Sequence, residues 1–353
     1  MKGRDSVDKI RWGVLGAGGI ADRRTLPGMM KAENAQLVAV MEVAAAEAER
    51  LRVKYSAKRA YTREEALLSD PEVDAVYIAS PVAFHARQIR LAADRGKHIL
   101  VEKPLALSAD EGQEVVQYCH KQGARIAAGL MMRFGGYVMA MKQAVARGSI
   151  GSLVSCGAQF TCWYPDIPGS WRQSRKSAGG GALMDMGVHC IDLIQYISGS
   201  RVRQVSAFND TLTFGYEVED SSMVLLRLDN GAMGMVQTNF NIPDEAAKWR
   251  LEFFGTNGRL LGDSVIGQVD GGSVDALFVG RTGGYDARQD VKRVEPVPLE
   301  AALGDMYARE IESFGHSILM GTPLEVPAED AIQVQRVVEA AYRSSRDKRV
   351  IEF

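Results

Sequence analysis

Short apolar segments alternate with amphipathic ones through the first third of the chain. Apolar runs of strand length lie at residues 10–15, 36–42, 74–79, 98–102 and 124–129. Helical spacing is found at residues 44–55, 83–95 and 109–121, and a further helical stretch after residue 19 is interrupted by Pro27. Strands that alternate with helices of this length form βαβ units with right-handed crossovers, so the pattern predicts a doubly wound parallel sheet.

From about residue 130 the pattern changes. Helices are predicted at residues 134–146, 182–197, 305–320 and 328–345, and single strands at 153–164 and 350–353. Two pairs of alternating segments, 223–228 with 233–240 and 251–254 with 259–261, are each joined by a turn that contains Asn-Gly. Because Asn-Gly turns are typical of β-hairpins, this part is expected to form an α+β domain with an antiparallel sheet. We therefore predict one domain over residues 1–130 and a second over residues 131–353.

Composition and charge exclude several classes of protein. The 353 residues are too many for one ordinary domain, and the net charge of −2 gives no sign of a nucleic-acid partner. No apolar run is long enough to span a bilayer, and residues 1–9 lack the apolar core of a signal peptide. For this reason no membrane partner is expected. The four cysteines have no paired or metal-type spacing, so we expect reduced thiols and a cytoplasmic location.

A glycine-rich motif follows the first predicted strand. Gly16-Ala17-Gly18-Gly19-Ile20-Ala21 has the form G-x-G-x-x-A and opens a helix. The first glycine allows a tight turn, the second lets the backbone approach a pyrophosphate, and the helix N-terminus offers N–H groups to phosphates. We expect Gly16, Gly18, Gly19 and Ile20 to bind a dinucleotide; the alternative, for the motif alone, is a turn without a ligand.

Glu42 ends the second predicted strand, 26 residues after Gly16. This is near the distance at which an acidic residue binds the ribose hydroxyls of a dinucleotide. A carboxylate there accepts from the 2′-hydroxyl and repels a 2′-phosphate, and no arginine lies between Glu42 and Ala48 to bind that phosphate. NAD is therefore favoured over NADP, and the alternative is a solvated glutamate at a strand end.

Two further strand ends have polar residues where ligands of doubly wound sheets bind. Four residues at or after the strand 74–79 are expected near the cofactor: Ala79, Ser80, Pro81 and His85. For His85 the alternative is a cap of its own helix. Glu102-Lys103-Pro104 follows the strand 98–102, so Glu102 and Lys103 are expected at the nucleotide crevice. For Lys103 the alternative is a surface side chain in a strand–helix loop.

The densest motif is GGGALMDMGVHCID at residues 179–192. Asp185 and His189 are four residues apart, so on a helix they share a face, and Asp192 lies further along that face. A histidine beside a carboxylate is the usual arrangement of a general base. One alternative is a metal site, although no second His or Cys cluster accompanies the motif. The other is a histidine that only packs between helices.

The glycine-rich motif, the acidic strand end, Glu102-Lys103-Pro104 and the motif at 179–192 occur in an order that resembles the glucose–fructose oxidoreductase/inositol dehydrogenase (Gfo/Idh/MocA) family. The resemblance extends over the whole chain. WGVLG at 12–16, GSIG at 148–151, Trp171-Arg172 and the closing segment 339–353 also resemble it. The resemblance implies a Rossmann domain followed by an α+β domain with a large, mostly antiparallel open sheet that often makes oligomer contacts. It implies a catalytic Lys103 and a catalytic Asp185–His189 pair. It also suggests that Arg133, Trp171 and Arg172 border the substrate or cofactor.

These observations together predict an NAD-dependent dehydrogenase that interconverts a secondary hydroxyl and a ketone. The resemblance suggests a sugar, an inositol-like polyol or a related carbohydrate as substrate, and a homodimer or homotetramer. His189 would take the hydroxyl proton, Asp185 would orient His189, and Lys103 would stabilise the alkoxide, with Lys103 and His189 converging over a nicotinamide ring. No metal is expected.

Two alternatives remain open: an NAD-dependent glycosidase with internal redox, and a non-catalytic dinucleotide- or sugar-binding regulator. The retained Lys103, Asp185 and His189 argue against the regulator, because a sensor need not keep proton-transfer groups.

Overall fold

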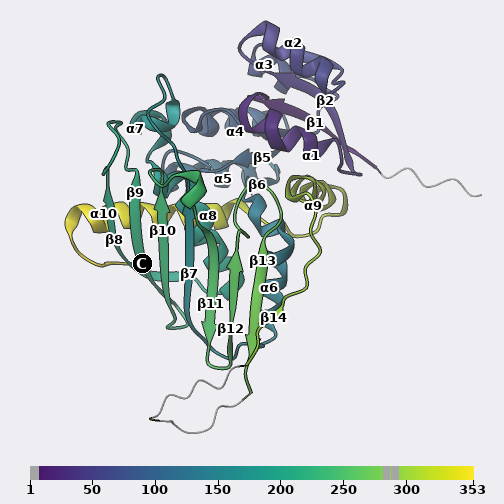
Figure 1. The fold of residues 1–353 in the computed structure, drawn as a ribbon. Helices are drawn as coiled ribbons and strands as arrows, with labels where there is room; N and C mark the ends of the chain where they lie inside the picture. The colour runs from purple at the N-terminus through teal and green to yellow at the C-terminus, as the bar shows by residue number, and fades with distance from the viewer. Residues whose placement is uncertain (1–7, 281–286, 288–293) are drawn as a thin grey trace, which may run out of the picture. The chain divides into compact units, whose positions relative to one another are not determined.

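The computed structural model describes residues 8–280, 287 and 294–353 and contains two sheets (Figure 1). The chain divides into two compact units that are not continuous in sequence. The first unit contains the described residues up to Met131, with Lys176–Gly179 and Asp305–Gln335. The second contains Met132–Arg175, the described part of Gly180–Gly304, and Arg336–Phe353. The predicted domain ranges of 1–130 and 131–353 stay a prediction; the compact units differ from them because residues 305–335 pack with the first unit.

The first unit contains a parallel sheet of six strands in the order β3-β2-β1-β4-β5-β6. Its strands are β1 (Ile10–Leu15), β2 (Ala35–Met41), β3 (Arg59–Tyr61), β4 (Ala75–Ile78), β5 (His98–Glu102) and β6 (Ile126–Gly129). The strand order reverses between β1 and β4, and doubly wound sheets bind their ligands at such a point. The predicted Rossmann topology is therefore confirmed.

Helices cover both faces of this sheet. They are α1 (Leu26–Met29), α2 (Ala45–Lys54), α3 (Glu64–Leu68), α4 (His85–Asp94), α5 (Ala109–Lys121) and α9 (Met306–Met320). Trp12 of β1 packs its ring 5.7 Å from the ring of Phe314 in α9. A Cβ on the next residue, Gly13, would come within 2.7 Å of Leu67 in α3. Because neighbouring residues of a strand point to opposite faces, α9 and α3 lie on opposite sides of β1.

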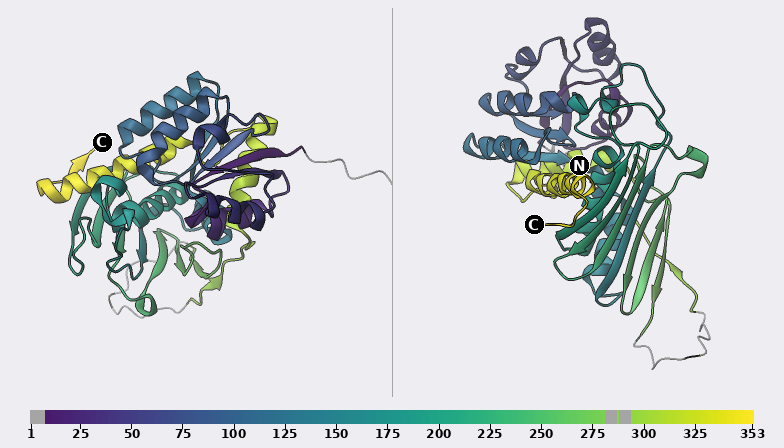
Figure 2. Two further views of the ribbon diagram at one scale, coloured as in Figure 1. Left: turned by 90° about the horizontal axis from the view of Figure 1, so that it is seen from above. Right: turned by 90° about the vertical axis from the view of Figure 1, so that its left-hand side faces the viewer.

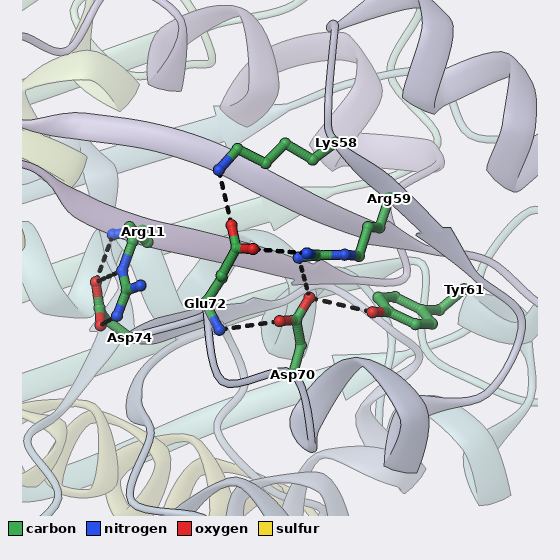
Figure 3. Close-up of polar contacts among 7 residues, drawn as sticks. All are labelled: Arg11, Lys58, Arg59, Tyr61, Asp70, Glu72 and Asp74. Carbon is green, nitrogen blue, oxygen red and sulfur yellow. Dashed lines mark hydrogen bonds and ion pairs between the residues drawn. The ribbon is translucent and has the colours of Figure 1, made fainter.

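The elements β3 and α3 were not predicted, because they are too short to show a hydrophobic period. A polar network connects β3 to the loop before β4 (Figure 3). Arg59 forms ion pairs with Asp70 at 2.9 Å and with Glu72 at 2.6 Å, and Lys58 pairs with Glu72 at 2.7 Å. The Tyr61 hydroxyl also donates to Asp70, at 3.1 Å. Side-chain polar contacts therefore link this edge strand of the sheet to the loop before β4.

The second unit contains a sheet of nine strands in the order β14-β13-β12-β11-β7-β10-β9-β8-β15. The strands are β7 (Leu153–Thr161), β8 (Val202–Asp210), β9 (Ser221–Leu228), β10 (Met233–Asn239), β11 (Trp249–Gly255), β12 (Gly258–Asp263), β13 (Ser273–Phe278), β14 (Val297–Pro298) and β15 (Ile351–Glu352). Every strand pair is antiparallel except β7 with β10. Both predicted hairpins, β9–β10 and β11–β12, are present, so the large, mostly antiparallel sheet is confirmed.

The helices of the second unit lie on one face of its sheet (Figure 2). They include α6 (Gly136–Ala146) and α8 (Val188–Ser198), and α8 packs on β7 and β10. Two helices extend across the division between the units, namely α7 (Arg175–Ala178) and α10 (Ala328–Asp347). Among the residues that the structure describes, no helix is both long and apolar enough to cross a membrane.

The opposite face of the nine-stranded sheet presents apolar side chains to solvent. Leu225 of β9 pairs with Met235 of β10, and Met223 of β9 pairs with Phe208 of β8. These four side chains and Met233 are exposed, Phe208 by 82% and Leu225 by 60%. Phe208, Met223, Leu225, Met233 and Met235 thus form a patch of exposed apolar side chains on this face.

Candidate active site

The glycine-rich loop lies between the carboxyl ends of β2 and β4. The N–H groups of Gly16 and Ala17 both donate to the carbonyl of Met41, at 3.1 Å. Gly16 has φ +68°, and a Cβ on it would lie 2.7 Å from the backbone nitrogen of Ser80. Any side chain at residue 16 would therefore strain the backbone and clash with the end of β4. The loop is thus held against the crevice that receives a pyrophosphate in doubly wound sheets.

The helix after this loop begins at Gly19, runs as a π-helix over Ala21–Thr25 and continues as α1. The predicted helical stretch is therefore present, and its π-helical segment ends two residues before Pro27. Pro27 has no N–H and cannot donate to the carbonyl four residues before it, which favours a wider turn ahead of it. The N–H of Ala21 donates to Gly18 at 3.1 Å, so Gly19 and Ile20 lie in the first turn, with N–H groups that have no partner within a helix.

Glu42 lies beside the glycine-rich loop. It follows β2, and its N–H donates to the carbonyl of Tyr61 at 3.2 Å. Its Oε1 accepts a hydrogen bond of 2.7 Å from the N–H of Gly18. The carboxylate therefore lies over the second glycine of the motif, which is the position expected of a ribose-binding acid. Contact with ribose itself stays a prediction.

His85 connects the loops that follow β4 and β5. Its Nδ1 is 3.0 Å from the carbonyl oxygen of Pro104, and its Nε2 is 2.8 Å from that of Ser80. The side chain is 1% exposed, and burial lowers its pKa. It is therefore a buried link between the segments of Ser80–Pro81 and Lys103–Pro104 and not a surface cap of α4. Contact between His85 and the cofactor stays a prediction. The same holds for cofactor contacts of Ala79, Ser80 and Pro81.

A chain of hydrogen bonds holds the end of β5. Thr25 donates to the hydroxyl of Tyr77 at 2.9 Å, and Tyr77 donates to the carboxylate of Glu102. Burial raises the pKa of Tyr77 well above its ordinary value, so this hydroxyl remains a donor. Glu102 also accepts from the N–H of Lys103 at 3.3 Å. Lys103 follows directly, half-buried, with a cis bond to Pro104.

Thr25 and Tyr77 were not among the predicted site residues. Tyr77 lies in an apolar strand, where an aromatic residue indicates core, and Thr25 lies in the first helix. Glu310 of α9 is another carboxyl in the interior of this unit. It is 3% exposed, and burial together with the negative charge of Glu102 raises its pKa well above the ordinary value.

In the second unit, Asp185 and His189 lie on either side of a helix junction. Residues Leu183–Gly187 form a π-helix, and α8 begins at Val188. The helix predicted over 182–197 is therefore present and consists of two helix types. Asp185 is half-exposed and His189 is buried. The pairing of these two side chains stays a prediction.

Glu219 holds the start of this segment. Its carboxylate accepts from the N–H groups of Gly181 at 2.9 Å and Leu183 at 3.0 Å, and from the hydroxyl of Tyr342 at 2.8 Å. A Cβ on Gly181 would overlap the carbonyl of Glu219, and one on Gly180 would overlap the hydroxyl of Tyr342. Gly180 and Gly181 are therefore needed for close packing around this carboxylate. Glu219 and Tyr342 were not predicted, because both are far from the motif in sequence.

Asp192 is paired with Arg133. The Arg133 guanidinium donates to both carboxylate oxygens, from Nε at 3.0 Å to Oδ2 and from Nη2 at 2.5 Å to Oδ1, and both side chains are buried. Within the described residues, no group of three or more His, Cys, Asp or Glu side chains is arranged to hold a metal ion. The predicted contact of Arg133 with substrate stays a prediction.

Arg172 lies between Trp171 and Asp185. Its guanidinium is 4.4 Å from the centre of the Trp171 ring, and its Nε is 3.8 Å from Asp185 Oδ1. Arg172 and Asp185 are both about one-third exposed, with 35% and 33% of the side chain accessible. The structure thus brings together three of the predicted substrate-side residues within one unit.

Comparison with known proteins agrees with this geometry. Residues 10–130 match a family model described as oxidoreductase family, NAD-binding Rossmann fold, and residues 138–261 match the GFO/IDH/MocA C-terminal domain. The chain is 30% identical over 344 residues to D-xylose 1-dehydrogenase (NADP(+)) 2 of Haloferax volcanii, covering 98% of this chain and 100% of the relative. It is 27% identical to myo-inositol 2-dehydrogenase of Thermotoga maritima, covering 98% of each.

A solved structure, the aldose-aldose oxidoreductase of Caulobacter crescentus complexed with glycerol, superposes with a TM-score of 0.87. The two sequences are 25% identical, and the superposition covers 98% of this chain and 100% of the other.

Proposed function

Since the chain belongs to the GFO/IDH/MocA family of oxidoreductases, we propose that it interconverts a secondary hydroxyl and a ketone on a carbohydrate with NAD as cofactor. The substrate class is a sugar, an inositol-like polyol or a related carbohydrate. The hydrogen bond from Gly18 to Glu42 supports the proposal most directly. This hydrogen bond joins the loop that we expect to bind phosphate to the acidic residue that we expect to bind ribose.

The residues of the first unit fit a dinucleotide. Gly16 lets the loop turn tightly against the end of β4, the second glycine, Gly18, lets the backbone approach a pyrophosphate, and the carboxylate of Glu42 is an acceptor for a ribose hydroxyl. Bound nicotinamide supplies the hydride acceptor or donor. NAD is proposed over NADP because a carboxylate repels a 2′-phosphate, although the xylose dehydrogenase relative is named for NADP.

The proton is handled by side chains of the protein. His189 accepts the proton of the substrate hydroxyl, and Asp185 stabilises the imidazolium that forms. Lys103 donates a hydrogen bond to the same oxygen and stabilises its developing negative charge. Arg172 and Arg133 offer donors to neighbouring hydroxyls, and Trp171 offers an apolar face to the sugar ring.

We further propose that the protein is a homodimer or homotetramer formed through the exposed face of the nine-stranded sheet. The apolar patch of Phe208, Met223, Leu225, Met233 and Met235 supports this. The four cysteines are free thiols, which fits a reducing compartment, and we propose the cytoplasm.

The test is a panel of sugars, inositols and sugar acids, each incubated with NAD or NADP and monitored for NADH or NADPH absorbance. We expect at least one carbohydrate to give NADH, with a higher kcat/KM for NAD than for NADP. A product formed without net NADH would indicate a glycosidase with internal redox. Binding of NAD without turnover of any carbohydrate would indicate a regulator.

A further inference from the structure

A second carboxylate lies over the glycine-rich loop beside Glu42. A Cβ placed on Gly18 would be 3.0 Å from Glu42 Oε1 and 3.9 Å from Glu47 Oε1. Glu47 is in the first turn of α2, and its side chain is 38% exposed. Two negative groups therefore surround the loop residue next to which the ribose hydroxyls of a dinucleotide are expected.

Arg50, one turn further along α2, is bound between two carboxylates. It donates to both oxygens of Glu47, from Nε at 2.7 Å and from Nη2 at 2.6 Å. The same Nη2 donates to Asp22, in the helix after the loop, at 2.9 Å. Burial would raise the pKa of Asp22, but hydrogen bonds from Lys54, Tyr55 and Arg50 lower it to about 2, so Asp22 is ionised at neutral pH.

This arrangement bears on the choice between NAD and NADP. A guanidinium binds a phosphate through the same two parallel N–H groups with which it binds a carboxylate. Glu47 occupies those groups of Arg50, so a 2′-phosphate would have to displace Glu47 while facing the charge of Glu42. Arg50 lies two residues beyond the interval from Glu42 to Ala48, which contains no arginine. Because it follows Glu47 by one helical turn, its guanidinium nevertheless reaches Glu47 and Asp22 beside the loop.

We infer that Glu47 is a second determinant of cofactor specificity, which favours a free 2′-hydroxyl by keeping Arg50 from binding a 2′-phosphate. The inference rests on the proposed dinucleotide site and extends it to two residues beyond the sequence motif. It makes Arg50 the phosphate-binding group that becomes available when Glu47 is neutralised.

The experiment measures the dissociation constants of NAD and NADP by calorimetry on the full chain, without substrate. Glu47→Gln is compared with Glu49→Gln, because Glu49 binds Arg52 on the same helix with the same spacing and nearly the same distances, 2.8 and 2.6 Å. Both variants remove one surface charge. Only Glu47 has its carboxylate near Gly18 and its arginine bound to Asp22 as well.

We expect Glu47→Gln to shift the NAD-to-NADP affinity ratio toward NADP by at least about tenfold, which is about 1.4 kcal/mol. Glu49→Gln should shift it by less than about twofold, as expected for a screened surface charge. Replacing Arg50 by Gln in the Glu47→Gln background should remove the gain. The inference is overturned if Glu47→Gln behaves like Glu49→Gln, or if the gain persists without Arg50.

Glu42→Gln is measured in the same series to separate this inference from the proposed function. A shift with Glu42→Gln but none with Glu47→Gln would overturn the role of Glu47 and leave the ribose contact intact. A wild-type protein that binds neither dinucleotide would overturn the proposed function and this inference with it.

Discussion

The hydroxyl of Tyr342 donates a 2.8 Å hydrogen bond to the buried carboxylate of Glu219. The same carboxylate accepts from two backbone N–H groups at the start of the segment that contains Asp185 and His189. One acidic side chain from the edge of β9 and one phenol from α10 thus fix where this helix begins. Glu219 and Tyr342 thus help to position both proposed proton-transfer residues, although they lie far from that motif in sequence.

We expect Glu219→Ala to destabilise the protein by about 3 kcal/mol, because it leaves two buried N–H groups and the Tyr342 hydroxyl without an acceptor. Urea denaturation would measure this change. Glu217→Ala is the control, since Glu217 accepts from the N–H of Arg175 at 2.9 Å on the exposed surface and should cost less than about 1 kcal/mol. Equal effects of the two substitutions would contradict the role assigned to Glu219.

Stability should fall as the pH rises above the ordinary pKa of a glutamic acid. Burial, and secondarily the charge of Glu102, raises the pKa of Glu310, so the folded protein keeps a proton that the unfolded chain releases. Stability from this group is complete below the unfolded pKa and is lost as the pH rises toward the folded one, with a slope of at most about 1.4 kcal/mol per pH unit. Glu310→Gln should flatten the profile of unfolding free energy at pH values above the ordinary pKa of a glutamic acid. An identical slope in both proteins would exclude Glu310 as its source.

Lys103→Met and His189→Asn should each lower kcat by at least about 10²-fold, because each removes a group that acts on the reacting oxygen. NAD binding should be retained in both variants when measured by calorimetry. Lys121→Met, at the exposed end of α5, is the matched control and should leave kcat within about twofold of wild type. Wild-type turnover by either site variant would remove that residue from the mechanism.

Leu225→Glu should dissociate the oligomer. Leu225 is 60% exposed in the centre of the apolar patch, so a charge there costs little in a monomer but is buried unpaired in an interface. Sedimentation velocity would detect the change in mass. Met320→Glu, at a 67% exposed apolar residue at the end of α9, is the control and should sediment like wild type. A monomeric wild-type protein would contradict the proposed assembly.

The sequence contained enough information to predict the topology of the first sheet and the position of Glu42. Both follow from local patterns, since every strand of this sheet except β3 is an apolar run and Glu42 stands at a fixed distance from the glycine motif. β3 and α3 were missed because their three and five residues are shorter than the period that would reveal them.

Contacts between distant segments could not be predicted. The partners of Glu219, Tyr77 and Arg133 come from other elements, and a single sequence does not indicate which buried polar residues will meet. Arg50 shows the same limit on a smaller scale. It lies beyond the interval that the motif spacing defines along the chain, but one helical turn places it beside Glu47.

The packing of Trp12 against Phe314 has a consequence for synthesis of the chain on the ribosome. Translation proceeds from the N-terminus, so β1 is made long before α9. Until α9 is made, the apolar face on which Trp12 lies lacks part of its cover and is exposed to aggregation and to chaperones. The nucleotide-binding unit therefore finishes folding only after α9 has emerged, and not when the glycine motif emerges.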